Sequence, residues 1–203
     1  MIKTKVQGTI LTFGRISINS FPETTKEAFI KYNRTFLNKT GYLPWYIQTL
    51  TEKLTAAFKR RNKSEILFIS SELSHYIADA LQPLHTSSNY DGQLTNQKGV
   101  HALWESFIPQ KFGNAYNFKT DTARYITDIA AETWKIIKQS HSLVQPLLTA
   151  EKQVRNSFPQ NKMYKKAASG KTVMFYNSPV FSDAYAKQFH IALNGMVEQQ
   201  FRH

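Results

Sequence analysis

Apolar residues recur every three or four positions along most of the chain, a spacing that predicts α-helices. Pro22 and Pro44 are expected to open the first two helices, Pro109 to end a short fourth one, and Ser178-Pro179 to cap the last. The expected helices cover about 22–41, 44–58, 64–81, 100–107, 120–138, 141–157 and 179–201. Only 9–19 and 171–176 have the character of strands. The expected fold class is therefore all-α, in a single multi-helix domain over 1–203.

The third expected helix carries His75 and Asp79 four positions apart, which places them on one face about 6 Å apart along the axis. The residues expected to face the core are Ile66, Ile69, Leu73, Ile77 and Ala80. At about 100° per residue, the histidine and the aspartate lie roughly opposite this stripe. They are therefore either exposed to solvent or covered by a second layer of helices as part of a site.

The next expected helix carries a second histidine–carboxylate pair, because His101 and Glu105 are also four positions apart. Between the two pairs lie His85, just after the helix-breaking Pro83, and a polar loop over 84–98 with a turn near Asp91-Gly92. One such pair alone is usually an ordinary contact on a helix surface, whereas two pairs with His85 in one window favour a metal site. The remaining histidines stand alone and are interpreted as surface residues: His141, His190 and His203.

Composition narrows the chemistry of such a site. The chain has 203 residues and no cysteine, so its metal ligands must be His, Asp and Glu side chains. Two imidazoles and a carboxylate are a standard zinc site, and three protein ligands leave a position for water, whose pKa the metal lowers to about 7. The chain contains neither a phosphate-binding loop motif nor the G-x-S-x-G motif of serine hydrolases.

The net charge of +12 is consistent with a polyanionic partner such as nucleic acid or anionic lipid, although solubility alone also explains it. Basic residues gather in two segments, 59–63 and 162–171, whereas the histidine-bearing segment 67–105 is acidic. No apolar run reaches the roughly 18 residues that span a membrane, and the N-terminus lacks the apolar core of a signal peptide.

With these residues assembled, the chain resembles the superfamily of zinc-dependent bacterial phospholipase C and single-strand-specific nucleases. The resemblance rests on the segment over 73–106, LSHYIADALQPLHTSSNYDGQLTNQKGVHALWES. Further similarity lies in GYLPW at 41–45, SHSLV at 140–144 and ALNGMVE at 192–198. The segment over 73–106 is similar to bacterial members in the order of its motifs, which are HY-x-x-D, QPLH, a polar loop and H-x-x-W-E. The resemblance implies an all-α fold around three zinc ions that hydrolyse phosphodiester bonds.

Ligand roles are also implied by this resemblance. One zinc ion is held by the residues that correspond to His85, His101 and Glu105. The other two share a bridging aspartate that corresponds to Asp79, which is thereby the catalytic carboxylate, and one of them takes the histidine that corresponds to His75. Nuclease members stack a base on an aromatic side chain, for which Tyr90 is the candidate, although a packing or solvent-exposed tyrosine is the simpler interpretation.

The chain departs from the family upstream, where the family has a zinc-binding Trp, two histidines and an aspartate. No histidine precedes His75, no aspartate precedes Asp79 and no tryptophan precedes Trp45. Residues 1–20 are thus atypical, and the chain is interpreted as a member that lacks the N-terminal ligand segment. We therefore expect about one zinc ion and weak or no hydrolysis, since two metals acting together on phosphate supply much of the rate. Such enzymes are typically exported, so a periplasmic or secreted location is expected.

Three functions follow from these observations. The first is a zinc-dependent phosphodiester hydrolase acting on single-stranded nucleic acid or another phosphodiester, weak or inactive in this form. The phospholipase variant is less favoured, because no amphipathic membrane-binding helix stands out. The second is a non-catalytic zinc- or nucleic-acid-binding helical protein descended from such an enzyme. The third is a basic RNA-binding module, which would bind no zinc.

Overall fold

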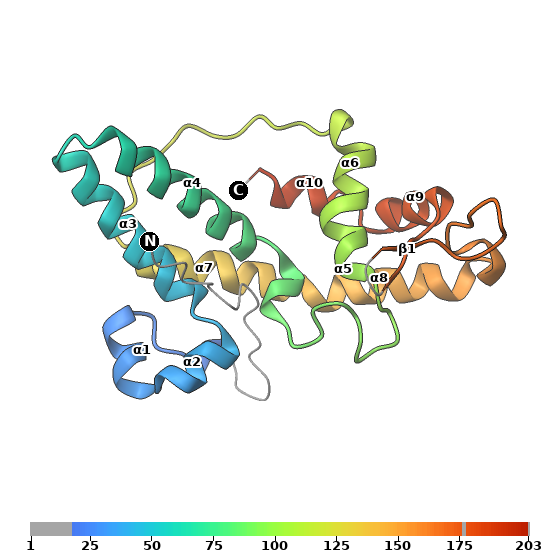
Figure 1. Ribbon diagram of the computed structural model, residues 1–203, viewed down its shortest axis with the longest axis horizontal. Helices are drawn as coiled ribbons and strands as arrows, with labels where there is room; N and C mark the ends of the chain where they lie inside the picture. The colour runs from blue at the N-terminus through green and yellow to red at the C-terminus, as the bar shows by residue number, and fades with distance from the viewer. Residues whose placement is uncertain (1–17, 176–177, 203) are drawn as a thin grey trace. The chain divides into compact units, whose positions relative to one another are not determined.

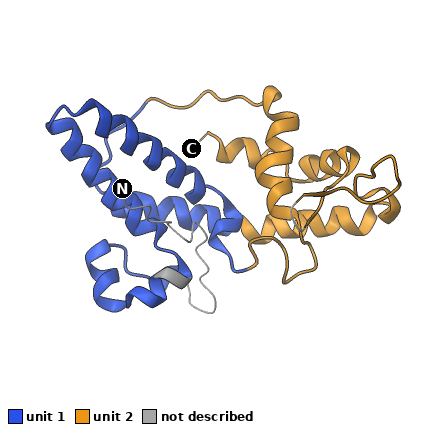
Figure 2. Ribbon diagram, in the orientation of Figure 1, with its two compact units in different colours: residues 1–88, 123–142 blue, residues 89–122, 143–203 orange. Residues whose placement is uncertain are grey.

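A computed structural model describes residues 18–175 and 178–202 of the chain, and these are mostly helical, as predicted (Figure 1). The chain divides into two compact units (Figure 2). Unit 1 contains the described residues up to Ser88 together with 123–142, and unit 2 contains 89–122 and the described residues from Leu143 onward. None of the described helices has the length and apolar composition that crossing a bilayer requires.

Unit 1 is built on two long antiparallel helices, α3 and α4, which pack together and against α7. Its helical elements are η1 (Ile18–Ser20), α1 (Thr25–Lys31), α2 (Arg34–Thr40), α3 (Leu43–Lys59), α4 (Lys63–Ala80), η2 (Pro83–Thr86) and α7 (Ile129–Ser142). Two buried tryptophans hold the N-terminal segment onto this core. The indole N–H of Trp45 donates to the carbonyl of Pro22 at 2.9 Å, and that of Trp134 to the carbonyl of Glu23 at 2.9 Å.

The predicted helix over 22–41 is in fact two helices. Thr24 caps α1 and Asn33 caps α2, each accepting a backbone N–H of the following turn through its side-chain oxygen. Asparagine at that position favours a new helix start over continuation, because its side chain bonds the local backbone. Gly41, with φ 82°, follows α2 at the predicted end. Pro44 lies in the first turn of α3, as predicted.

The buried face of α4 follows the predicted stripe except at Ile77, because Ala80 is buried and Ile69 and Leu73 pack against the core. Tyr76, Asp79 and Ala80 are buried, whereas Ile77 is 36% exposed. The face that packs on the core thus runs through Tyr76 and Ala80, with Asp79 at its edge rather than opposite to it. Ile77 is one residue from Tyr76, and one residue turns a helix face by about 100°, so Ile77 lies off that face.

Unit 2 is built on α8 and α9, which pack against each other. Its elements are α5 (Val100–Ala102), the π-helical turn η3 (Leu103–Phe107), α6 (Ile108–Phe112), η4 (Gly113–Ala115), α8 (Val144–Ser157), η5 (Gln160–Lys162), β1 (Met174–Phe175), β2 (Ser178–Pro179), α9 (Asp183–Ala192) and α10 (Met196–Gln200). Strands β1 and β2 are antiparallel, with Met174 opposite Pro179 and Phe175 opposite Ser178.

Several predicted limits were wrong in the second half of the chain. The helix that begins at Val100 continues through Pro109 to Phe112, because a π-helical turn precedes Pro109 and leaves it in the first turn of α6, where its missing N–H is tolerated. Residues 120–128 are not helical. Ser178-Pro179 forms β2, and Ser182 caps α9 instead. The predicted strand over 9–19 lies outside the described residues, apart from its last two, which belong to η1.

Candidate metal centre

The C-terminal turns of α4, in unit 1, bring His75 and Asp79 together as the four-residue spacing predicts. Nε2 of His75 lies 3.4 Å from Oδ2 of Asp79. The two residues differ in environment, because the side chain of His75 is 67% exposed and that of Asp79 is 12% exposed. Oδ2 of Asp79 is buried and has no hydrogen-bond partner among the described residues. A buried oxygen in that condition is ordinarily compensated by a water or a cation.

His85 lies in η2, directly after Pro83, and is buried beside the same aspartate. Its Nδ1 is 3.2 Å from the backbone carbonyl oxygen of Asp79 and 3.4 Å from the carboxylate Oδ1. A carbonyl oxygen can only accept, so Nδ1 carries the proton and the lone pair of the ring is on Nε2. Histidines that bind metals show this pattern, since the hydrogen bond of one ring nitrogen orients the other toward the ion.

A second histidine supports this turn, contrary to the prediction that His141 is an isolated surface residue. Its Nδ1 lies 3.0 Å from the carbonyl oxygen of Thr86 and 3.1 Å from the hydroxyl oxygen of the same residue. That hydroxyl donates to the carbonyl of Pro83 at 2.7 Å. The contact joins α7 to η2 and holds the segment that carries His85. Sequence spacing could not reveal it, because 55 residues separate the partners.

His101 and Glu105 form the corresponding pair in unit 2. Nε2 of His101 and Oε2 of Glu105 are 2.6 Å apart, across the junction of α5 and η3. The start of this helix is fixed by Asp91, whose Oδ1 accepts the backbone N–H groups of Gly99 at 3.0 Å and of His101 at 3.3 Å. Gly99 has φ 96°, a conformation that side chains disfavour, and it turns the loop into α5.

Tyr90 lines a pocket of about 250 Å³ in unit 2 whose wall also contains His101 and Glu105. The lining also includes Phe175 of β1 and Phe181, shortly after β2. Tyr90 is 38% exposed. The tyrosine predicted from sequence therefore lines the same pocket as the His101–Glu105 pair, together with aromatic, apolar and polar side chains.

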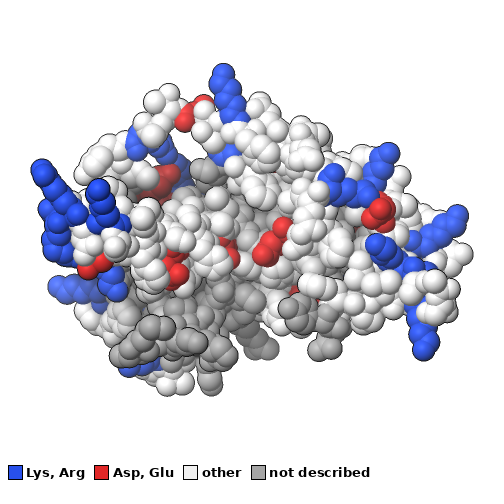
Figure 3. Space-filling model, turned by 45° about the horizontal axis from the view of Figure 1, so that its top comes forward, with Lys and Arg blue, Asp and Glu red and all other residues white. Residues whose placement is uncertain are grey.

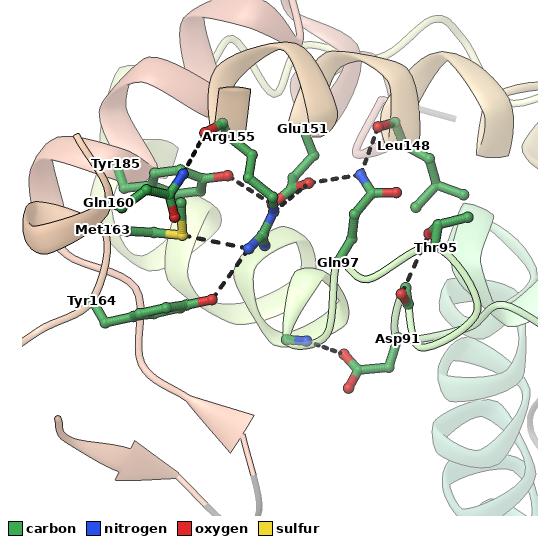
Figure 4. A network of polar contacts seen from close by, with 12 residues as sticks. Asp91, Thr95, Gln97, Leu148, Glu151, Arg155, Gln160, Met163, Tyr164 and Tyr185 are labelled. Atoms are coloured by element: carbon green, nitrogen blue, oxygen red, sulfur yellow. Dashed lines mark hydrogen bonds and ion pairs between the residues drawn. The ribbon is translucent and has the colours of Figure 1, made fainter. Parts of the chain in front are cut away.

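A buried network holds the loop before α5 and was not apparent from sequence (Figure 4). Glu151 of α8 is fully buried and accepts from Nε of Arg155 at 2.9 Å and from the hydroxyl of Tyr185 at 2.7 Å. The side-chain amide of Gln97 donates to Glu151 at 2.6 Å and to the carbonyl of Leu148 at 2.7 Å. Burial and the bond to Glu151 raise the pKa of Tyr185, so its hydroxyl remains a donor at neutral pH. Through Gln97, the loop is anchored to α8 a few residues before His101.

Comparison with protein-family models, curated proteins and solved structures finds no match. The functional assignment therefore rests on the side chains described above. In unit 1 they are His75, Asp79 and His85, clustered where α4 ends. In unit 2 they are His101 and Glu105, with Tyr90 on the wall of the same pocket.

Proposed function

We propose that the chain is a zinc-dependent phosphodiester hydrolase of the nuclease or phospholipase C type, with one zinc ion bound by His85, His101 and Glu105. The observation that carries the proposal is the contact between the ring of His85 and the end of α4. Its Nδ1 donates to the carbonyl of Asp79 at 3.2 Å, which leaves Nε2 as the coordinating atom. A buried histidine whose Nδ1 is held by a backbone carbonyl in this way resembles histidines that bind metals through Nε2.

The three donors fit the ion by chemistry. Together they would offer two imidazole nitrogens and one carboxylate oxygen. Zinc takes these atoms readily, and three protein ligands are typical of a catalytic rather than a structural zinc ion. When bound, the ion supplies Lewis acidity toward a phosphate oxygen and lowers the pKa of water. The protein positions the ring of His85 through the carbonyl of Asp79 and the backbone of His101 through the carboxylate of Asp91.

The pocket beside His101 supports a substrate with an aromatic ring. Tyr90 offers a partly exposed ring on its wall, and stacking on a base contributes about 1–3 kcal/mol per base. A single-stranded nucleic acid supplies both an unpaired base for that ring and a phosphodiester for the metal. The net charge of +12 favours the same partner.

His75 and Asp79 form a less complete second site. Two ligands are too few for tight zinc binding, and His75 is largely exposed. The buried Oδ2 of Asp79, without a hydrogen-bond partner among the described residues, retains the capacity to bind a cation. We therefore propose about one zinc ion per chain and weak or absent hydrolysis, because two-metal action on phosphate requires the second ion.

Metal content by elemental analysis, measured together with hydrolysis of single-stranded DNA with and without chelator, tests the proposal. The native chain should contain about one zinc ion, and His85→Ala should contain none. Glu105→Gln should also lose the ion and should fold normally, since its side chain is 49% exposed. His75→Ala is the matched control and should keep the ion. Absence of zinc from the native chain, with an unchanged melting temperature in chelator, would refute the metal site; three zinc ions would refute the incomplete second site.

A non-catalytic zinc-binding or nucleic-acid-binding protein is the second candidate, and the two-ligand site at His75 and Asp79 favours it. Zinc content would then match the first proposal, whereas hydrolysis would stay at the background rate at every zinc concentration. Chelator-sensitive cleavage of single-stranded DNA that is abolished in His85→Ala would exclude this candidate.

A further inference from the structure

The turn between α3 and α4 in unit 1 carries a dense group of exposed cations. Lys59, Arg60, Arg61 and Lys63 occupy four of five consecutive positions, and all four are exposed. Asn62 caps α4 by accepting the N–H of Glu65 at 3.2 Å, so the turn between the helices has a defined conformation. Figure 3 shows Lys and Arg side chains gathered at this end of unit 1.

Three large apolar side chains are exposed near this turn, in the last turn of α3 and the second turn of α4. Phe58 is 58% exposed, Leu67 is 74% exposed and Phe68 is 68% exposed. Phe58 lies next to the cations in the last turn of α3, and Leu67 lies one helical turn after Lys63, on the same face of α4. We call these three residues and the four cations the basic tip. Single exposed apolar residues are common, but three beside four cations indicate an interaction surface.

The charge of the basic tip is only partly compensated. Arg60 pairs with Glu65, and both side chains are largely exposed, at 58% and 44%. Lys59, Arg61 and Lys63 form no ion pair with any of the described residues. The tip therefore presents three further cations to a partner, which must be anionic to complement them.

We propose that the basic tip binds the surface of an anionic lipid bilayer. Leucine has no ring and cannot stack on a base, yet Leu67 is the most exposed of the three apolar residues. Insertion of Phe58, Leu67 and Phe68 among acyl chains uses all three, and the cations then lie at the level of the lipid phosphates. The attachment is peripheral and does not depend on the proposed zinc site.

Sedimentation of the full chain with vesicles tests this proposal. Vesicles of phosphatidylcholine with phosphatidylglycerol should bind the chain, and vesicles of phosphatidylcholine alone should bind it far more weakly. Lys59→Gln with Arg61→Gln should weaken binding about 25-fold, since each cation near an anionic surface contributes about fivefold. Leu67→Ser with Phe68→Ser should weaken it at least about tenfold.

Lys162→Gln with Lys165→Gln is the matched control, because it removes the same charge from exposed positions in unit 2. It should bind vesicles nearly as well as the native chain. Equal weakening by both pairs would show a general charge effect and overturn the proposal. It would also fail if the tip variants bound vesicles normally but lost affinity for a single-stranded oligonucleotide, because the tip would then be a nucleic-acid surface. Since every substituted side chain is exposed, unchanged circular dichroism should accompany all variants.

Discussion

Replacing Arg155 with methionine removes the guanidinium that faces the buried carboxylate of Glu151. The carboxylate is completely inaccessible to solvent, and the side chain of Arg155 is only 16% exposed. Methionine keeps most of the length of the apolar stem, so the main change is the loss of charge and of the bonds from Nε and the two terminal nitrogens. Glu151 would retain Tyr185 and Gln97 as donors, but no cation from Arg155.

The expected loss of stability is large because the remaining charge stays buried. Breaking a buried ion pair by removing one partner costs about 3–5 kcal/mol. For a chain of this length, that corresponds to a fall in melting temperature of about 6–20 °C. Adding Glu151→Gln to Arg155→Met removes the stranded charge and leaves an oxygen that can still accept from Tyr185. The double variant should therefore recover at least half of the loss.

Urea denaturation followed by circular dichroism measures these differences. Arg60→Met is the matched control, because its partner Glu65 is on the surface, and an exposed pair contributes about 0–1 kcal/mol. If the double variant were as unstable as Arg155→Met, the loss would come from packing of the arginine stem rather than from an uncompensated charge. A loss below about 1 kcal/mol in Arg155→Met would show that the carboxylate is not held in a low-dielectric environment.

Two further predictions concern the loop before α5 and the packing of α9. Gly92→Ala should lower the free energy of unfolding by at least about 2 kcal/mol in urea denaturation, since φ is 71° and the new Cβ would lie 2.5 Å from the carbonyl oxygen of Gln97. Gly113→Ala is the control and should be nearly neutral, because a Cβ there meets open space. Burial against Phe112 lowers the pKa of His190 below 6.5, so the unfolded state binds protons more readily and stability should fall as the pH decreases below about 6.5. His190→Gln should reduce this fall, and an unchanged pH dependence would show that partial burial of the ring does not lower the pKa of His190.

Helices were predicted correctly where capping residues and apolar spacing indicated the same helix. The prediction was wrong where a local contact set the start or end of a helix. Pro44 and the stripe of α3 point to the same helix, which is present. Asn33 caps a new helix within an apolar pattern that continues unchanged across it, so spacing alone missed the break. Pro109 was expected to stop a helix, but a π-helical turn before it allows the helix to continue. Glu151 and Arg155 are four residues apart, as many surface pairs are, and only the fold reveals that they are buried.

In the candidate site, the identity of the donor residues could be predicted from sequence, whereas their orientation could not. The types and spacing of His75, Asp79 and His85 could be read from sequence, but not which ring nitrogen would face a metal. That depends on the way α4 ends. Proline cannot donate to the helix ladder, so Pro83 directs the chain out of α4 and into η2.

The turn through η2 brings His85 back onto the carbonyl of Asp79, one of the last-turn carbonyls of α4 that can accept outside partners. The helix end therefore fixes the tautomer of the ring. This assigns to Pro83 a functional consequence that its usual role as a helix breaker would not suggest, because a longer α4 would carry His85 away from the oxygen that orients it.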